Sequence, residues 1–225
     1  MSHAGPRLLA IFDHDGVMVD SLAFHQDAWV ELGRRAGLPI TAEFIHETFG
    51  MTNPAILARL MGDAYLPEEG DRLAGLKEAC YRDMAQGKIT LMDGVNELFE
   101  NLVSAGVLLA IGSSAVRPNL DLTIESCGLG QHFTSIASLE DIQRGKPDPQ
   151  VFLVAAEKAG VEPKHAVVFE DALVGIKAAK AAGMRAVGVT SSHPAAALWD
   201  AGADDVVETL AGYDVPALVE RLRQP

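Results

Sequence analysis

Two aspartates separated by one residue follow the first apolar run of the chain, a predicted strand at Arg7–Phe12. On an extended strand end, side chains two positions apart point to the same side, so Asp13 and Asp15 could face one substrate. One carboxylate could attack phosphorus and form an aspartyl-phosphate, while the other protonates the leaving oxygen and later deprotonates water. Gly16 would let the chain turn sharply past this pair.

A second acidic pair, Glu170 and Asp171, follows a later apolar run. Together with Asp13 and Asp15, it would place four carboxylates in one cleft, where like charges raise one another's pKa. A hard divalent cation with oxygen ligands resolves this conflict, and these ligands suit Mg²⁺. Such a cation would also let an acidic protein accept an anionic substrate.

Hydroxyl and ammonium groups follow two further predicted strands. Ser113 and Ser114 follow one of them, and Lys146 lies in the segment after the next. Ser113 and Lys146 could hold the oxygens of a phosphoryl group, because positioning and charge stabilisation are most of what phosphoryl transfer needs. The two serines could also cap the next helix, and such a helix end can itself bind phosphate.

Short apolar runs alternate with helical patterns, and this order predicts an α/β fold with a doubly wound, Rossmann-like parallel sheet. The predicted strands are Arg7–Phe12, Val107–Ile111, Ser135–Ala137, Ala166–Phe169, Arg185–Val189 and, more weakly, Asp205–Val207. The predicted helices between them are Val95–Ala105, Pro149–Ala159 and Leu173–Ala182, each followed by glycine. Ligands of such sheets bind at the carboxyl ends of the strands, where all the residues above would meet.

Residues 21–91 interrupt this alternation. Helical patterns occur there at Leu22–Ala36, Ala42–Thr48, Pro54–Leu60 and Glu68–Gln86, with no convincing strand. The sequence therefore predicts a catalytic α/β core of residues 1–20 and 92–225, with an all-helical cap domain of residues 21–91 inserted after the first strand.

Four motifs in this order resemble those of the haloacid dehalogenase superfamily of aspartate-nucleophile phosphatases. They are Phe12–Val17, Ile111–Ser114, Gly145–Phe152 and Phe169–Ala172. The resemblance implies Asp13 as nucleophile, Asp15 as acid and base, and Ser113 and Lys146 on the phosphoryl group. It also implies Mg²⁺ held by Asp13, the backbone carbonyl of Asp15, Glu170 and Asp171.

Within the superfamily, the chain looks most like the branch with a helical cap that includes beta-phosphoglucomutase. His25 and Trp29 match its first cap helix, Lys77 matches a cap lysine facing the substrate, and Gly50–Asn53, with Thr52 and Asn53, matches a cap loop reaching into the site. Asn53 stands where the mutase has an arginine for the second phosphate, and Ala115–Arg117 replaces its Ser-Lys-Asn. These differences favour a plain phosphatase of a small phosphorylated metabolite over a sugar-phosphate mutase, although Arg117 could compensate in part.

Each motif alone also has an ordinary structural reading. The two aspartates could form a turn, Glu170 and Asp171 could cap a helix, and Lys146 and Lys77 could be solvated surface lysines. A non-catalytic phosphate-binding domain with the same fold also stays open. The agreement of four motifs after four strands favours catalysis.

The composition excludes several other classes. The chain has 225 residues, 48% of them apolar and 22% charged, which is typical of a globular protein. A formal charge of −13 disfavours nucleic acid and anionic membranes as partners. No apolar run approaches a membrane span, and two distant cysteines fit a reducing, cytoplasmic location. The sequence leaves the oligomeric state open.

Overall fold

The computed structural model describes residues 5–48 and 52–224. The chain divides into two compact units, one formed by Met1–Asp20 with Thr90–Pro225 and the other by Ser21–Ile89. We call them the core unit and the helical unit. The helical unit ends at Ile89, where the sequence analysis places the boundary at residue 91.

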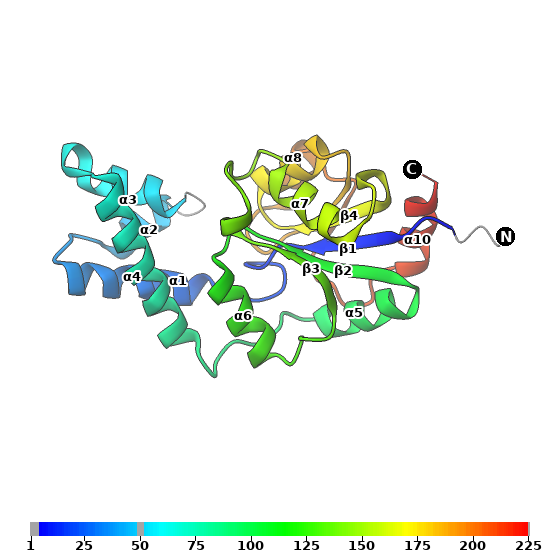
Figure 1. Ribbon diagram of the computed structural model, residues 1–225, viewed down its shortest axis with the longest axis horizontal. Helices are drawn as coiled ribbons and strands as arrows, with labels where there is room; N and C mark the ends of the chain where they lie inside the picture. Colours follow the sequence, from blue (N-terminus) through cyan, green and yellow to red (C-terminus); the bar gives the residue numbers. More distant parts are fainter. Residues whose placement is uncertain (1–4, 49–51, 225) are drawn as a thin grey trace. The chain divides into compact units, whose positions relative to one another are not determined.

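The core unit contains a six-stranded parallel sheet in the order β3-β2-β1-β4-β5-β6. Figure 1 labels β1 to β4 of this sheet. The strands are β1 (Leu8–Phe12), β2 (Val107–Gly112), β3 (Phe133–Ala137), β4 (Ala166–Glu170), β5 (Arg185–Val189) and β6 (Asp205–Val207). Every residue of β1 and β4 is buried, which explains their uninterrupted apolar runs. The prediction of a doubly wound parallel sheet is confirmed.

Helices cover both faces of this sheet. Figure 1 shows α7 (Gln150–Ala159) and α8 (Leu173–Ala181) on one face, and α5 (Val95–Ser104) and α6 (Arg117–Ser126) on the other. The remaining helical elements of the unit are α9 (Ala195–Asp200), α10 (Val215–Arg223) and the short 3₁₀ turns Leu139–Asp141 and Pro163–His165. The sequence analysis does not predict α6, because its first turn is polar and its apolar periodicity is weak.

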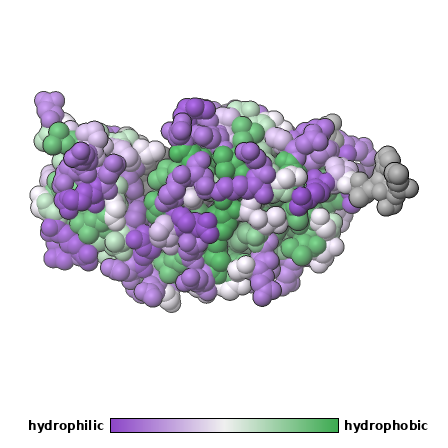
Figure 2. All heavy atoms as spheres, in the orientation of Figure 1, coloured by the Kyte–Doolittle hydropathy of each residue, from purple (hydrophilic) through white to green (hydrophobic). Residues whose placement is uncertain are grey.

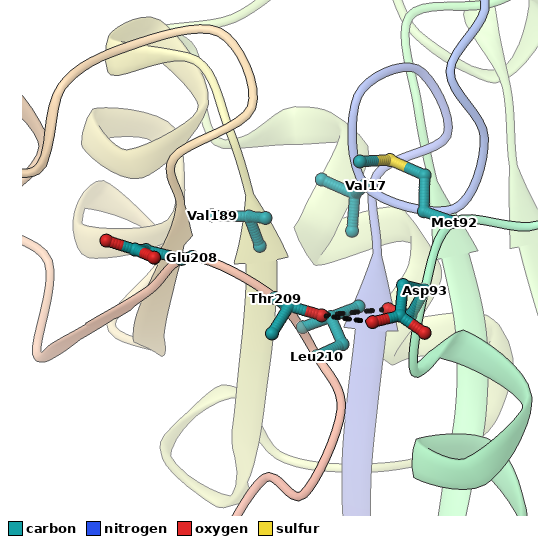
Figure 3. Close-up of a pocket in the computed structure, with 7 residues that line it drawn as sticks. All are labelled: Val17, Met92, Asp93, Val189, Glu208, Thr209 and Leu210. Atoms are coloured by element: carbon teal, nitrogen blue, oxygen red, sulfur yellow. Dashed lines mark hydrogen bonds between the residues drawn. The ribbon is translucent and has the colours of Figure 1, made fainter.

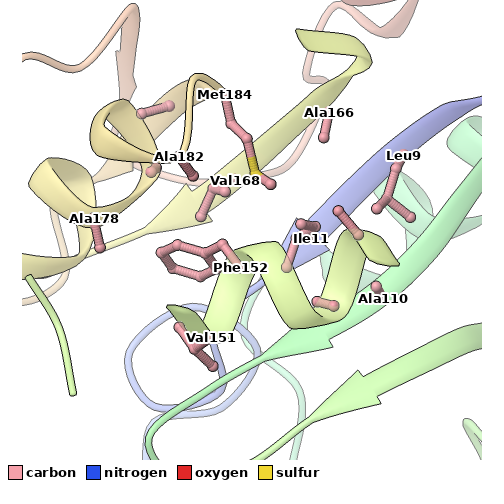
Figure 4. Close-up of a cluster of buried hydrophobic side chains, with 14 of the residues drawn as sticks. Leu9, Ile11, Ala110, Val151, Phe152, Ala166, Val168, Ala178, Ala182 and Met184 are labelled. Carbon is pink, nitrogen blue, oxygen red and sulfur yellow. The ribbon is translucent and has the colours of Figure 1, made fainter. Parts of the chain in front are cut away.

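Apolar packing fixes the two central strands from both sides. On one face, Ile11 and Val168 pack into a buried cluster with Phe152 of α7 (Figure 4). The ring of Phe12 stacks on that of Phe169, with 4.7 Å between centroids, and meets Phe99 of α5 edge-on at 4.8 Å. The residues that follow β1 and β4 therefore start from rigid strand ends.

The helical unit consists of α1 (Leu22–Ala36), α2 (Ala42–Thr48), α3 (Asn53–Met61), the 3₁₀ turn Gly62–Ala64 and α4 (Pro67–Ala85). No strand occurs among its described residues. Its own apolar core contains Trp29, Leu32, Ile45, Ile56, Leu57 and Leu73. The unit thus buries an apolar cluster of its own, as a separate domain does.

The surface of the protein and the length of its helices can be compared with what the composition predicts. Figure 2 shows hydrophilic residues over much of the face in view, with apolar residues between them. Within the described parts of the chain, no helix is both long and apolar enough to cross a membrane.

Candidate active site

Three buried carboxylates meet at the carboxyl ends of β1 and β4. Asp13 follows β1, Glu170 is the last residue of β4, and Asp171 comes next. One carboxylate oxygen from each lies within 4.8 Å of the others. The strand order turns at this position, since β2 and β3 lie on one side of β1 while β4, β5 and β6 lie on the other. Open α/β sheets bind their ligands at such a point.

A buried lysine neutralises part of this charge. The Lys146 ammonium lies 2.6 Å from Glu170 Oε1, to which it donates a hydrogen bond, and 2.9 Å from Asp13 Oδ1. We call Asp13, Lys146, Glu170 and Asp171 the carboxylate cluster. Burial alone would lower the pKa of Lys146, but the carboxylates of Asp13 and Glu170 outweigh burial and raise it. When ionised, three carboxylates and one ammonium leave a net charge of −2.

Glu170 fits against the start of α8 only because residue 175 is glycine. Its Oε2 accepts a hydrogen bond of 2.7 Å from the backbone N–H of Ala172. A Cβ atom at Gly175 would lie 1.8 Å from Glu170 Oε1, so a larger residue would displace the carboxylate. Burial raises the pKa of Glu170 to about 8, although the Lys146 ammonium opposes the shift. Keeping Glu170 ionised in this buried position thus costs free energy, and a bound cation would offset that cost.

A segment after β5 that the sequence analysis does not assign to the site holds Asp171. The Ser192 hydroxyl donates to Asp171 Oδ2, Ser191 Oγ lies 3.3 Å from the same oxygen, and His193 Nδ1 lies 3.1 Å from the Asp171 carbonyl oxygen. Burial is the largest cause that raises the pKa of Asp171 to about 6, and Asp13 adds to it. The position of this segment at a strand end was the only available signal, because serines and histidine in loops are common.

The same segment closes on the turn after Asp15. Ser191 Oγ donates a hydrogen bond of 2.5 Å to the carbonyl oxygen of Gly16. Gly16 has a φ of +76°, and a Cβ atom there would lie 2.0 Å from Asp171 Oδ2. The turn predicted at Gly16 therefore requires glycine for two reasons: its positive φ and the close approach of the Asp171 carboxylate.

Asp15 lies beside the carboxylate cluster, and its side chain is turned toward His14. The two side chains are joined at 2.9 Å between Asp15 Oδ1 and His14 Nδ1. His14 is 1% exposed, and its Nε2 lies 2.7 Å from Thr123 Oγ1 of α6. Burial opposes the charged form of His14, but the Asp15 carboxylate outweighs it and raises the pKa. The sequence analysis assigns no role to His14 or Thr123, whose contact spans 109 residues.

The predicted phosphate-binding serines lie at the end of β2. Ser113 is buried, its backbone N–H donates to the Ala137 carbonyl over 3.0 Å, and its Oγ accepts from the Ala115 N–H over 3.2 Å. Ser114 is exposed. Asp13 and Ser113 thus directly follow strands of the sheet, Glu170 and Asp171 stand at the end of β4, and Lys146 lies in the segment between β3 and α7.

Three predicted substrate residues belong to the helical unit. Lys77 is buried; its ammonium donates to Glu78 Oε1 over 2.9 Å and lies 2.6 Å from His25 Nδ1, while the Asn53 amide donates to the same Glu78 oxygen over 2.7 Å. We call His25, Asn53, Lys77 and Glu78 the lysine cluster. Thr52 is exposed. The positions Gly50 and Met51 of the predicted cap loop lie outside the described residues.

A small pocket of about 130 Å³ lies elsewhere in the core unit (Figure 3). It is lined by Val17, Met92, Asp93, Val189, Glu208, Thr209 and Leu210. The Thr209 hydroxyl donates to the Asp93 carbonyl oxygen over 3.2 Å, which joins the chain after residue 90 to the segment after β6. None of the predicted site residues lines this pocket.

Comparison with known proteins agrees with this geometry. A model of the family described as haloacid dehalogenase-like hydrolase matches residues 10–189. The chain is 32% identical over 194 residues to validoxylamine A 7'-phosphate phosphatase from Streptomyces hygroscopicus subsp. limoneus, across 86% of this chain and 90% of that protein. It is 30% identical over 222 residues to beta-phosphoglucomutase from Bacillus subtilis, across 95% of each. The crystal structure of a HAD hydrolase of family IA, variant 3, from Entamoeba histolytica is 26% identical, with a TM-score of 0.87 over 96% of this chain and 99% of that chain.

The fold and the carboxylate cluster define an α/β enzyme with a helical insertion after its first strand. The chain belongs to the haloacid dehalogenase-like hydrolases, in the branch that resembles beta-phosphoglucomutase. It is a phosphoric monoester hydrolase, and the prediction of this class is confirmed.

Proposed function

We propose that this enzyme is a Mg²⁺-dependent phosphatase of a small phosphorylated metabolite, acting through a phosphorylated Asp13. The observation that carries the proposal is the carboxylate cluster at the turn of the strand order. Within it, the Asp13 carboxylate is buried and forms an ion pair of 2.9 Å with the Lys146 ammonium, which also pairs with Glu170. One ammonium shared between buried carboxylates leaves negative charge that an incoming cation would compensate.

The donor set fits a hard divalent cation. All three candidate side chains are carboxylates, and the net charge of −2 is the charge that such an ion cancels. We infer that Asp13, Glu170, Asp171 and the backbone carbonyl of Asp15 would hold Mg²⁺. When bound, the ion supplies positive charge that lets an anionic phosphoryl group approach three carboxylates.

The chain's own residues divide the reaction into two displacements. An Asp13 carboxylate oxygen forms a bond to phosphorus as the bond from phosphorus to the leaving oxygen breaks, and Asp15 donates a proton to that oxygen. Asp15 then accepts a proton from water, whose oxygen attacks phosphorus and releases phosphate from Asp13. Ser113 and Lys146 hold the phosphoryl oxygens during both steps.

The substrate class rests on the names of the relatives. One relative is named for a phosphatase of validoxylamine A 7'-phosphate and another for a phosphatase of phosphorylated carbohydrates. They support a small, sugar-like phosphomonoester as substrate. Assignment of Thr52, Asn53 and Lys77 to a substrate-selecting cap belongs to the same proposal. So does the cytoplasmic location.

A screen of phosphorylated sugars, nucleotides and glycolytic acids would test the proposal, with free phosphate measured in Mg²⁺ and in EDTA. We expect hydrolysis of at least one sugar phosphate, lost in EDTA and restored by Mg²⁺. Acid-quenched enzyme should carry phosphate that hydroxylamine releases, as an acyl phosphate does. Turnover that EDTA leaves unchanged, or no hydroxylamine-labile phosphate, would contradict the proposed mechanism.

The second candidate is a sugar-phosphate mutase, which the relative from Bacillus subtilis favours. Such an enzyme must hold a second phosphate, and Arg117 and Lys77 are the candidates. Arg117 Nε donates to Asp121 Oδ1 over 2.7 Å at an exposed position, so its guanidinium is already paired. Glucose 1-phosphate with a bisphosphate primer separates the two activities, because only a mutase gives the 6-phosphate without free phosphate.

A further inference from the structure

His14 stands between Asp13 and Asp15 in the sequence and is buried, and the proposed reaction does not use it. Burial of an imidazole is costly unless its nitrogens are hydrogen-bonded. Here both nitrogens have side-chain partners, Asp15 on one side and Thr123 on the other. Both partners are side chains, so this arrangement depends on the residue types at positions 15 and 123.

The chemistry of a carboxylate fixes the direction of the hydrogen bond between His14 and Asp15. An ionised carboxylate only accepts, so His14 Nδ1 carries the proton that is donated to Asp15 Oδ1. In the neutral ring, Nε2 is then an acceptor for the Thr123 hydroxyl, and in the charged ring Nε2 donates to Thr123 Oγ1; the two atoms lie 2.7 Å apart. The Thr123 hydroxyl can bind the ring in both forms, and in both it holds the ring with Nδ1 toward Asp15.

His14 and Thr123 are buried and rigid, whereas the Asp15 carboxylate that they hold is at the surface. Thr123 is fully buried on α6, and His14 is 1% exposed. The Asp15 side chain is 36% exposed and would otherwise sample several rotamers. A bond from a buried, doubly held ring to Oδ1 fixes that rotamer, and with it the direction of the whole carboxylate.

We propose that His14, held by Thr123, is a positioning residue that orients the Asp15 carboxyl for proton transfer to the leaving oxygen. This inference rests on the proposed function, in which Asp15 is the acid. In that step the O–H bond of Asp15 breaks and a new O–H bond forms on the leaving oxygen, while His14 keeps its Nδ1 proton. His14 thus acts through Asp15 and touches no reacting atom.

Thr123→Val tests the bond to His14, because it keeps the shape of the side chain and removes the hydroxyl. Thr123→Ser is the matched control that keeps the hydroxyl. With an alkyl phosphate, whose leaving group needs a proton, we expect kcat of Thr123→Val to fall about 10-fold with KM unchanged, a fraction of the 10²- to 10⁴-fold typical of general acid catalysis. With p-nitrophenyl phosphate, whose leaving group needs none, kcat should stay within about 2-fold, and Thr123→Ser should behave as the wild type.

An equal loss on both substrates would overturn the positioning role and leave only a structural one. A wild type that hydrolyses neither ester would instead overturn the proposed function, so the two failures are distinguishable. If Thr123→Val does not fold, ¹⁵N NMR of histidine in the wild type decides, with the signal of His14 assigned by its loss in His14→Asn. A proton on Nδ1 supports the proposal, and an unprotonated Nδ1 overturns it.

Discussion

The core unit and the helical unit each bury a cluster of polar side chains around one lysine, and the two clusters differ in charge. In the lysine cluster, the Lys77 ammonium faces a single carboxylate, Glu78, so the pair is neutral. In the carboxylate cluster, the Lys146 ammonium faces three carboxylates. The first cluster is complete with the chain's own groups, whereas the second has a surplus of negative charge.

The pKa directions follow from the same difference. Burial would raise the pKa of Glu78, but Lys77, followed by His25, outweighs it and lowers the pKa. Burial raises the pKa of Glu170, and the opposing effect of the Lys146 ammonium does not cancel that rise. A buried charge that the fold leaves uncompensated is typical of a binding site, whereas a compensated pair is typical of structural support.

The largest effect should come from Asp13→Asn, which removes the proposed nucleophile. We expect kcat on p-nitrophenyl phosphate to fall at least about 10³-fold, because an amide cannot form the aspartyl-phosphate. The melting temperature should stay the same or rise, since one of three like charges is lost. Asp63→Asn, an exposed position of the helical unit, is the matched control and should keep its activity. Retention of activity by Asp13→Asn would remove Asp13 from the nucleophile's role.

Much of this site could be predicted because the fold brings strand ends together. The positions of Asp13, Ser113, Lys146 and Glu170 follow from apolar runs that each end in a polar residue, and a parallel sheet places those ends at one edge. No contact between distant residues was needed for that prediction. The central strands β1 and β4 are apolar up to their carboxyl ends because every one of their residues is buried.

The rest depends on pairings that a linear pattern does not record. The bond between His14 and Thr123 and the contacts of Ser191 and Ser192 with Asp171 join residues far apart in the chain. Each is an ordinary polar residue in its local context. Lys77 lies on α4 where a solvated lysine would be expected. Its burial depends on the neighbouring Glu78 and His25 and on the rings of Trp29 and Tyr81, each 5.7 Å from its ammonium.

Removal of either lysine's charge should destabilise the fold, and more strongly in the core unit. Lys146→Met leaves buried Asp13 and Glu170 without a counter-charge, for which we expect a loss of about 3 to 5 kcal/mol in unfolding free energy in EDTA. Lys77→Met leaves Glu78 with the Asn53 amide still donating to it, so about 1 to 3 kcal/mol is expected.

Lys164→Met is the surface control for both, because the pair of Lys164 with Glu162 is exposed and should contribute less than about 1 kcal/mol. Urea unfolding of the three variants gives the comparison. Equal losses for Lys146→Met and Lys77→Met would contradict the difference in charge between the clusters.

Mg²⁺ should stabilise the protein through the carboxylate cluster alone. At 100 times its Kd, a ligand that binds only the folded state adds about 2.7 kcal/mol. For a chain of this length that is a rise of roughly 5 to 10 °C in melting temperature. Asp171→Asn should lose most of this rise, whereas Glu78→Gln, the matched change in the lysine cluster, should keep it. An undiminished rise in Asp171→Asn would place the cation elsewhere.

The smallest expected effect is a pH dependence of opposite sign in the two clusters, measured in EDTA. Burial raises the folded-state pKa of Glu170 from 4.5 to about 8 and that of Asp171 from 3.8 to about 6, so the folded state binds more protons between these limits. Its unfolding free energy must then fall as pH rises from about 4 to about 8. The pKa of Glu78 is lowered, so its contribution is complete above 4.5 and is lost as pH falls through its folded-state pKa.

Two substitutions separate these slopes in thermal unfolding scans. Glu170→Gln should flatten the decline in melting temperature between pH 5 and 8, because it removes the group whose folded-state pKa is raised the most. Glu78→Gln should leave that decline in place and reduce the loss of stability below pH 4.5. Saturating Mg²⁺ should also abolish the decline, because an ion that binds the ionised carboxylates removes the advantage of protonating them. A decline that persists in Glu170→Gln and in Mg²⁺ would show that other groups cause it, and the contrast between the two clusters would then lose its thermodynamic support.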